Sequence, residues 1–359
     1  MRRHALTAYV FAAGMVLMLG ALRYPWHNWD MIGYAAVACE RAQPDAGELH
    51  ARVFKELEAW ASPGGFHDLT RVDSFRQTVA TDPASLQELL PLYRNKPLYI
   101  AAVRAMVTAG MDVYAALHLL SALCAALGLW LVAVGFQRMP AWGALALPLV
   151  AALAGLVTVS RIATPDAMAF AGVALAALLM LRRSRTLVFV LALLPLVRPE
   201  LIVFSMLAAL WWALRGERWW ALGAAVAAGL TFLATKYLAA GYGWERLFWF
   251  TFVEVTPYPA RLEPDLTVAF YLRRVAIGVK LWLMQREFWV LAMCVGWLVW
   301  RYRRGGVWQS AGAMAALFAL ATSVAVFFVF PLTEGRFVAG ASVLLFAAAA
   351  SPPATDTTL

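Results

Sequence analysis

The sequence predicts an all-α polytopic membrane protein, and three observations lead to this fold class. Hydrophobic residues make up 63% of the 359 residues and charged residues only 14%, against roughly 45–50% and about 25% in soluble domains. Apolar runs of helical length recur along the chain, and arginines gather in the short gaps between them. A soluble fold cannot bury so much apolar surface, so we expect most of the chain to lie in a membrane.

Ten apolar segments are candidates for membrane crossings. A helix needs about 20 apolar residues, with a range of about 17–25, to cross a bilayer. The longer candidates are 6–22, 113–136, 141–159, 165–181, 219–235 and 307–330, and the shorter ones are 186–197, 201–214, 288–300 and 337–350. The sequence therefore predicts about ten transmembrane helices in a single membrane domain over residues 1–359. Arg2 and Arg3 precede the first segment as in a signal peptide, but no small-x-small cleavage motif precedes Arg23, which favours a membrane anchor.

The arginines predict which ends of these helices face the cytoplasm. Eleven of them lie at the N-terminus or in short gaps: Arg2, Arg3, Arg138, Arg182, Arg183, Arg185, Arg215, Arg218, Arg301, Arg303 and Arg304. By the positive-inside rule these gaps are cytoplasmic, as is the tail 351–359. The long segments 23–112 and 236–287 then lie outside. The net charge of +9 thus reflects topology, and we expect no nucleic-acid partner.

The stretch 186–214 is predicted to be a short hairpin. Arginine clusters flank both of its ends, so it should cross the membrane an even number of times. Its halves have 12 and 14 residues, and each reaches only about 20 Å against a hydrocarbon core of about 30 Å. The tip, Arg198–Pro199–Glu200, would then lie recessed in a protein-lined or wet cavity. The alternative is that ordinary helix ends extend past these boundaries.

The outside segments have the patterns of structured regions. Apolar residues recur on one helical face over 49–60, and Asp82–Pro83 has the N-cap and first-turn pattern of a second helix. The apolar segment 98–110 and the mixed basic and apolar segment 270–285 are too short or too polar to span. We therefore predict interfacial helices at both.

Ionisable residues gather at the predicted outer ends of the spans. They are Asp30, Lys96, Arg161, Asp166, Arg198, Glu200, Glu334 and Arg336. Glycine-rich phosphate loops and the CxxC, HExxH and GxSxG motifs are absent. Carboxylates on one membrane face suit proton or metal chemistry, and guanidinium groups suit an anion. These residues predict an active or binding pocket at the outer face.

The stretches that carry these residues resemble the GT-C class of integral membrane glycosyltransferases. Members of this class take a sugar from a polyprenyl-phosphate donor outside the cytoplasmic membrane. The matching stretches, in order, are HNWDMIGY, RNKPLYIAAVRAMVTAGMDVYAALHLLSALCAALGLW, TPDAMAFAGVALAALLML, LVRPELIVFSMLAALWW and PLTEGRFVAG. They cover most of the chain. Some branches of the class have two acids after the first span, whereas this chain has Asp30 alone, which leaves metal dependence open.

The resemblance implies roles for the acids and the lysine. Asp30 would be the general base that deprotonates the acceptor hydroxyl, and its alternative role is to cap a helix beginning at Met31. Asp166 would contact substrate or metal, or cap the helix that it starts. Lys96 is similar to the Lys-Pro position that contacts the donor phosphate, and its alternative is a solvated loop lysine.

Arg198 and Arg336 also have two interpretations each, one functional and one structural. Arg198 and Arg336 suit a lipid phosphate, because a guanidinium donates two parallel hydrogen bonds to it. Alternatively they form structural ion pairs with Glu200 and Glu334, each two residues away in sequence. Arg161, beside the start of the span at 165–181, is predicted to contact substrate as well.

The expected function is transfer of a sugar, hexosyl or pentosyl, from a polyprenyl-phosphate donor to a hydroxyl of a glycan, lipid or protein acceptor. The expected location is a bacterial inner membrane, with multiple passes, contact with membrane lipids and an active site facing the periplasm or the outside. No cofactor is required by the pattern, and a divalent metal stays open. The alternatives are a transporter or lipid flippase for an anionic or glycosylated substrate, although the inverted repeats typical of transporters are absent, or a non-enzymatic assembly subunit.

Overall fold

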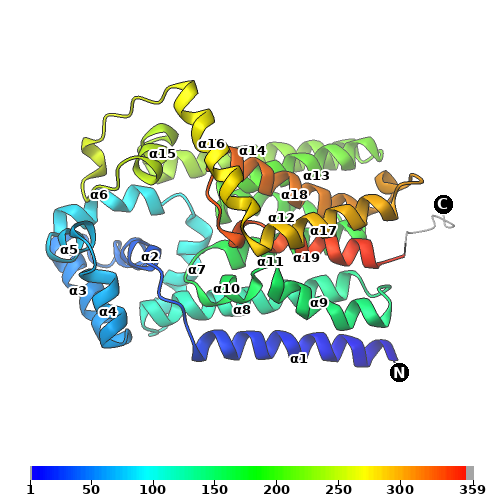
Figure 1. The fold of residues 1–359 in the computed structure, drawn as a ribbon, viewed down its shortest axis with the longest axis horizontal. Coiled ribbons are helices and arrows are strands. Elements are labelled where there is room, and N and C mark those ends of the chain that lie inside the picture. The colour runs from blue at the N-terminus through cyan, green and yellow to red at the C-terminus, as the bar shows by residue number, and fades with distance from the viewer. Residues whose placement is uncertain (1, 353–359) are drawn as a thin grey trace.

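The computed structural model describes residues 2–352, and this part of the chain contains helices and no β-strand. Figure 1 shows a bundle of roughly aligned helices with shorter helices gathered at one end. The prediction of an all-α fold is confirmed. We call the shorter helices at that end the outer cap, and they belong to the two long segments between the apolar runs.

Each of the ten predicted apolar segments contains a helix. The bundle is formed by α1 (Arg2–Arg23), α8 (Val113–Gly135), α9 (Ala141–Leu153), α10 (Leu156–Arg161), α11 (Asp166–Leu181), α12 (Leu187–Val197), α13 (Ile202–Leu214), α14 (Arg218–Ala239), α17 (Arg286–Arg301), α18 (Ala311–Val329) and α19 (Ala339–Ala350). By length and composition, three helices in the described part can cross a membrane: His4–Arg23, Val113–Gly135 and Ala311–Val329. The chain thus has helices of the transmembrane type, and the count of ten stays a prediction.

One predicted span differs from the structure. The segment 141–159 was expected to be continuous, but α9 ends at Leu153 and α10 begins at Leu156. Gly155 lies between them with φ +95°, a left-handed conformation that only glycine adopts without strain. A hydropathy profile does not reveal the break, because the residues on both sides of it are apolar. The break starts the short helix α10, which ends at Arg161.

The outer cap contains the helices predicted at 49–60, after Asp82–Pro83, at 98–110 and at 270–285, together with helices that were not predicted. Together they are α2 (Asp30–Cys39), α3 (Ala46–Trp60), α4 (Pro63–Thr70), α5 (Ser74–Thr81), α6 (Pro83–Tyr93), α7 (Pro97–Thr108), α15 (Trp244–Phe252) and α16 (Val268–Leu283). Leu49, Val53 and Leu57 on α3 are buried, which confirms the predicted apolar face. Asp82 caps α6, because its carboxylate accepts a hydrogen bond from the backbone N–H of Ala84 at 2.9 Å.

The two long segments contact each other, although the chain crosses the bundle several times between them. The Tyr258 hydroxyl donates to the Asp82 carboxylate at 2.5 Å, and the Tyr242 hydroxyl donates to the carbonyl of Glu88 at 2.7 Å. The Ser85 hydroxyl donates to another carbonyl of the second segment at 2.9 Å. Both segments therefore lie at the same end of the bundle, as the predicted topology requires.

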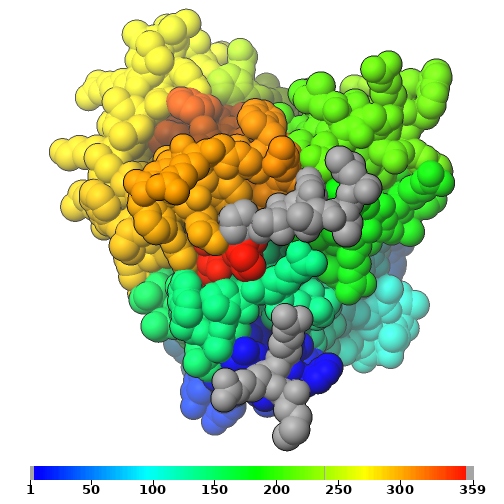
Figure 2. Space-filling view, turned by 90° about the vertical axis from the view of Figure 1, so that its right-hand side faces the viewer, coloured from blue at the N-terminus to red at the C-terminus, as the bar shows by residue number. Residues whose placement is uncertain are grey.

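The arginine-rich gaps gather at the opposite end. Arg138 and Arg301 line one surface hollow together with Pro352, and the Arg185 guanidinium lies 5.1 Å from the ring centre of Trp220. Figure 2 views the molecule from this end, with green, orange and red segments toward the viewer. These gaps thus share one end of the bundle, and its cytoplasmic location stays a prediction.

Thiol labelling tests the predicted topology. Ala59→Cys on α3 and Val255→Cys in the second long segment are expected to react with a membrane-impermeant maleimide in intact cells, and Glu217→Cys only after permeabilisation. All three positions are exposed, while the three native cysteines are buried and should contribute little background. Labelling of Glu217→Cys in intact cells, at the level of Ala59→Cys, would contradict the orientation.

Candidate functional site

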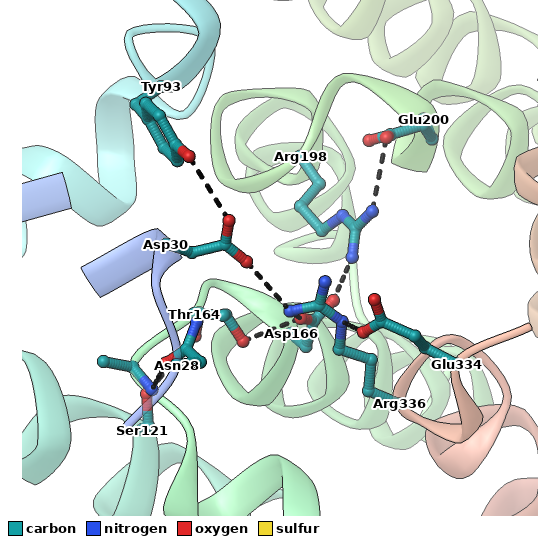
Figure 3. Close-up of polar contacts among 11 residues, drawn as sticks. Asn28, Asp30, Tyr93, Ser121, Thr164, Asp166, Arg198, Glu200, Glu334 and Arg336 are labelled. Carbon is teal, nitrogen blue, oxygen red and sulfur yellow. Dashed lines mark hydrogen bonds and ion pairs between the residues drawn. The ribbon is translucent and has the colours of Figure 1, made fainter. Parts of the chain in front are cut away.

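Seven charged side chains meet where the outer cap joins the bundle. This charged cluster consists of Asp30, Lys96, Asp166, Arg198, Glu200, Glu334 and Arg336. They come from the starts of α2, α7 and α11, the tip of the α12–α13 hairpin, and the segment between α18 and α19. Figure 3 shows six of them converging from these separate elements. Seven of the eight predicted site residues are thus brought together.

Asp166 is the buried centre of the charged cluster. Its side chain is only 4% exposed, and it pairs with Arg198 and, at 3.6 Å, with Arg336. The Thr164 hydroxyl donates a hydrogen bond to the same carboxylate at 2.7 Å. Asp166 is the first residue of α11 but makes no capping bond, so the capping alternative is wrong. The carboxylate instead holds two guanidinium groups in place.

The tip of the α12–α13 hairpin carries its charges inward. α12 ends at Val197, and a 3-10 turn over Pro199–Leu201 leads into α13. The Arg198 side chain is 13% exposed and lies 3.3 Å from Oε1 of Glu200, while Oε2 of Glu200 is buried without a hydrogen-bond partner in the described part of the chain. The hairpin tip is therefore protein-lined, as predicted. An unpaired buried carboxylate oxygen is costly, so it is a candidate acceptor for a ligand hydroxyl.

Asp30 is a half-open acid that contacts a buried arginine. Its side chain is 36% exposed, and it lies 3.4 Å from Nη1 of Arg336. The Tyr93 hydroxyl donates to its other oxygen at 3.3 Å. α2 begins at Asp30 itself and has no side-chain cap, so the capping alternative is wrong here too. The carboxylate is anchored on one side and open on the other, as a general base must be.

Gly33 makes room for the tyrosine that orients Asp30. A Cβ atom at Gly33 would collide with the Tyr93 ring, so only glycine at this place on α2 lets the ring lie against the helix. At the far end of α2, the Arg104 guanidinium donates to the carbonyls of Val37 and Ala38 at 2.6 and 3.1 Å. These contacts fix α2, and with it Asp30, against α6 and α7.

Lys96 is the cation of the charged cluster that lacks an ion pair. It precedes Pro97 at the start of α7, and its ammonium lies 5.5 Å from the ring centre of Tyr34. Within residues 2–352 no carboxylate lies within 4 Å of it, whereas Arg198 and Arg336 each have at least two such partners. Desolvation by burial lowers the pKa of Lys96 to about 8, although Glu200 opposes this shift. Lys96 is half-buried, so it is not a fully solvated loop lysine.

Arg336 links the outer and inner acids. It contacts Asp30 and Asp166 at 3.4 and 3.6 Å, and its Nε pairs with Glu334. Its own side chain is 14% exposed. The ion-pair alternative for the arginines is therefore observed for both of them. Ion pairing does not exclude phosphate binding, because an anion can exchange with a carboxylate on the same guanidinium.

The ring of Phe337 supports both guanidinium groups. Arg198 and Arg336 lie 5.0 and 5.1 Å from its centre, within the range of cation–π contacts. The carbonyl of Phe337 accepts a hydrogen bond from the Ser323 hydroxyl of α18 at 2.9 Å. Beyond the guanidinium groups a cavity of about 70 Å³ continues between α11, α18 and α19, and its deeper walls are mostly apolar.

Arg161 is not part of the charged cluster, contrary to the prediction. Its Nε donates to the carbonyl of Tyr24 at 2.6 Å, and its own carbonyl accepts from the N–H of Trp26 at 3.0 Å. The N–H of Ala163 donates to the Asn28 side chain at 3.2 Å. Arg161 thus binds the link between α1 and α2 to the end of α10. It positions Asp30 only indirectly.

The charged cluster does not match a divalent-metal site. In the described part of the chain no three His, Cys, Asp or Glu side chains gather as metal ligands. Asp30 and Asp166 both face guanidinium groups, and these cations take the place that a metal would occupy between them. The geometry favours neutralisation of an anion by side chains of the protein.

Comparisons with protein-family models, curated proteins and solved structures find no match to this chain. The charged cluster, and the chemistry that its side chains permit, are therefore the guide to function.

Proposed function

We propose that this protein is an integral membrane glycosyltransferase of the GT-C type that uses a polyprenyl-phosphate sugar. The observation that supports this most is the pairing of a half-open carboxylate with cations that suit a phosphate. Asp30 lies 3.4 Å from Arg336, and Lys96 faces the same charged cluster without an ion pair of its own. A base and an anion site side by side are what glycosyl transfer from a lipid phosphate requires.

In this proposal the acceptor hydroxyl attacks the anomeric carbon, and the bond from that carbon to the phosphate oxygen breaks. Asp30 takes the hydroxyl proton, and the polyprenyl phosphate leaves with the bonding electron pair. Lys96 and Arg336 neutralise the charge that develops on the phosphate. Inversion at the anomeric carbon is expected from the resemblance to the class.

The proposal also includes the membrane arrangement. About ten helices cross a bacterial inner membrane, and the outer cap with the charged cluster faces the periplasm or the outside. The arginine-rich end supports this orientation by the positive-inside rule. The acceptor is a glycan, a lipid or a protein hydroxyl that approaches from the outer cap.

The decisive assay uses purified protein in lipid nanodiscs with a polyprenyl-phosphate sugar and a panel of hydroxyl acceptors. Release of free polyprenyl phosphate that depends on an acceptor is the expected result. The rival function, a transporter or flippase, predicts movement of labelled lipid or sugar across proteoliposomes without cleavage of the sugar–phosphate bond. Movement without cleavage would replace our proposal with the rival.

Lys96→Ala is expected to weaken donor binding by about 1.5–3 kcal/mol, the range for hydrogen bonds to charged groups. Because the pKa of Lys96 is lowered to about 8, wild-type affinity should fall as pH rises through this value and the ammonium loses its proton. Lys96→Arg keeps its charge there, so its affinity should stay level. Donor dissociation constants across this range test both statements, with Lys55→Ala on the exposed side of α3 as control. Unchanged donor affinity in Lys96→Ala would place the lysine outside the phosphate site.

A further inference from the structure

We propose that Glu334 holds the phosphate position on Arg336 before the donor binds, and that the donor displaces it. This inference rests on the proposed function and adds a specific carboxylate that competes with the substrate. In the free protein Glu334 occupies the anion site on Arg336, and the site becomes available when the donor phosphate replaces this carboxylate.

The geometry singles out Glu334 among the acids that contact Arg336. The Glu334 side chain is 48% exposed, against 36% for Asp30 and 4% for Asp166. Asp166 is shared with Arg198 and Thr164, so its departure would unpair buried groups. Glu334 has Arg336 as its ion-pair partner in the described structure and can leave into solvent.

The backbone around Glu334 also permits this movement. The residue lies in the non-helical segment between the end of α18 at Val329 and the short turn Gly335–Phe337. Its side chain makes no capping hydrogen bond to that turn. The turn itself is held by Phe337, through Ser323 and the two guanidinium groups. The Glu334 side chain can therefore rotate away while Arg336 stays fixed.

The balance of charges in the charged cluster also favours exchange of Glu334 for the donor phosphate. It has four carboxylates (Asp30, Asp166, Glu200 and Glu334) and three cations (Lys96, Arg198 and Arg336). A phosphodiester donor adds one more negative charge to a largely buried site, where an uncompensated charge is costly. Exchange of Glu334 for the phosphate keeps the number of anions facing Arg336 constant.

Protonation of Glu334 would have the same effect as its departure. Burial raises the pKa of the Glu334 carboxyl, Arg336 opposes this, and the charges of Asp30 and Asp166 add to it. From α17, the Glu287 side chain packs against the neighbouring Gly335 and carries a further carboxylate paired with Arg286. A protonated Glu334 cannot compete for Arg336. Donor affinity should therefore be higher at low pH and fall as pH rises through the pKa of Glu334.

Glu334→Gln tests the proposal in a direct binding assay with a polyprenyl-phosphate sugar. At about pH 7 the variant should bind the donor roughly twofold to fivefold more tightly than wild type, because a partly exposed ion pair contributes modestly. The variant should also lose the decline in affinity that wild type shows as pH rises through the pKa of Glu334. Glu334→Ala should behave in the same way, which guards against an effect specific to the amide. Glu287→Gln removes the same charge next to Gly335 and should leave affinity unchanged.

The possible outcomes separate this inference from the proposed function. Equal or weaker donor binding by both Glu334 variants, with wild type binding normally, would overturn the inference and leave the glycosyltransferase proposal intact. If Glu287→Gln increases donor affinity by the same factor, the increase is due to the change in net charge and not to Glu334, and the inference is overturned. Absence of donor binding by wild type at every pH would overturn the proposed function and this inference with it.

Discussion

Asp30→Asn is expected to slow sugar transfer by about 10²- to 10⁴-fold, the usual contribution of a general base, while the protein stays folded. The amide has nearly the same shape and can still accept the hydrogen bond from the Tyr93 hydroxyl. It cannot take a proton from an acceptor hydroxyl at neutral pH. Because Asp30 makes no helix-capping bond, its substitution removes no cap. The measurement is the initial rate of polyprenyl-phosphate release at saturating donor and acceptor.

A matched control separates loss of the base from loss of an acid anywhere in the outer cap. Asp82→Asn removes the same charge at the start of α6, where asparagine caps a helix as well as aspartate does. Its transfer rate should stay near that of wild type. Donor affinity of Asp30→Asn should also change little, because Lys96 and Arg336 remain. A normal transfer rate in Asp30→Asn would leave Asp30 as a member of the ion-pair network only.

The charged cluster was largely predictable because charge is rare in this sequence. A buried ionisable group near a membrane must have a partner, and the outer ends of successive helices lie on one face. These two rules identify Asp166, Arg198 and Arg336 without any knowledge of how the helices pack. They cannot tell where around the bundle each helix end lies. Arg161 satisfies the same rules, yet it binds the link after α1.

The site residues that could not be predicted from the sequence are uncharged. Tyr93 and Thr164 position Asp30 and Asp166 with single hydroxyl groups, and hydroxyl side chains are common throughout helices. Gly33 gives a weak signal in the sequence, since a glycine within an apolar helix costs about 1 kcal/mol of stability and so suggests a structural reason for its presence. Gly155 gives the same weak signal inside the apolar segment 141–159. For Gly33 the reason is a contact with Tyr93, distant in sequence, and for Gly155 it is the left-handed backbone conformation between α9 and α10. Only the fold reveals either of them.

The largest expected effect on stability is at Asp166, because its carboxylate neutralises two guanidinium groups at once. Arg198 and Arg336 are 13% and 14% exposed, so neither can gain full hydration if this partner is lost. Removal of one partner of a buried ion pair typically costs about 3–5 kcal/mol, since it leaves an uncompensated charge. Replacing both partners with apolar groups is often close to neutral, for the same reason.

Asp166→Ala is therefore expected to lower stability by about 3–5 kcal/mol, and the double variant Asp166→Ala with Arg198→Met should recover part of that loss. The readout is the temperature at which detergent-solubilised protein loses its monodisperse gel-filtration peak. Asp112→Ala provides the control: it removes an acid that caps α8 through the N–H groups of Tyr114 and Ala115, at a cost of about 1 kcal/mol. Asp166→Ala should be clearly less stable than this control. Because Arg198 also pairs with Glu200, a triple variant that adds Glu200→Gln removes the acid that Arg198→Met leaves unpaired. If neither the double nor the triple variant is more stable than Asp166→Ala, the loss arises from packing at the start of α11 and not from the unpaired guanidinium of Arg198.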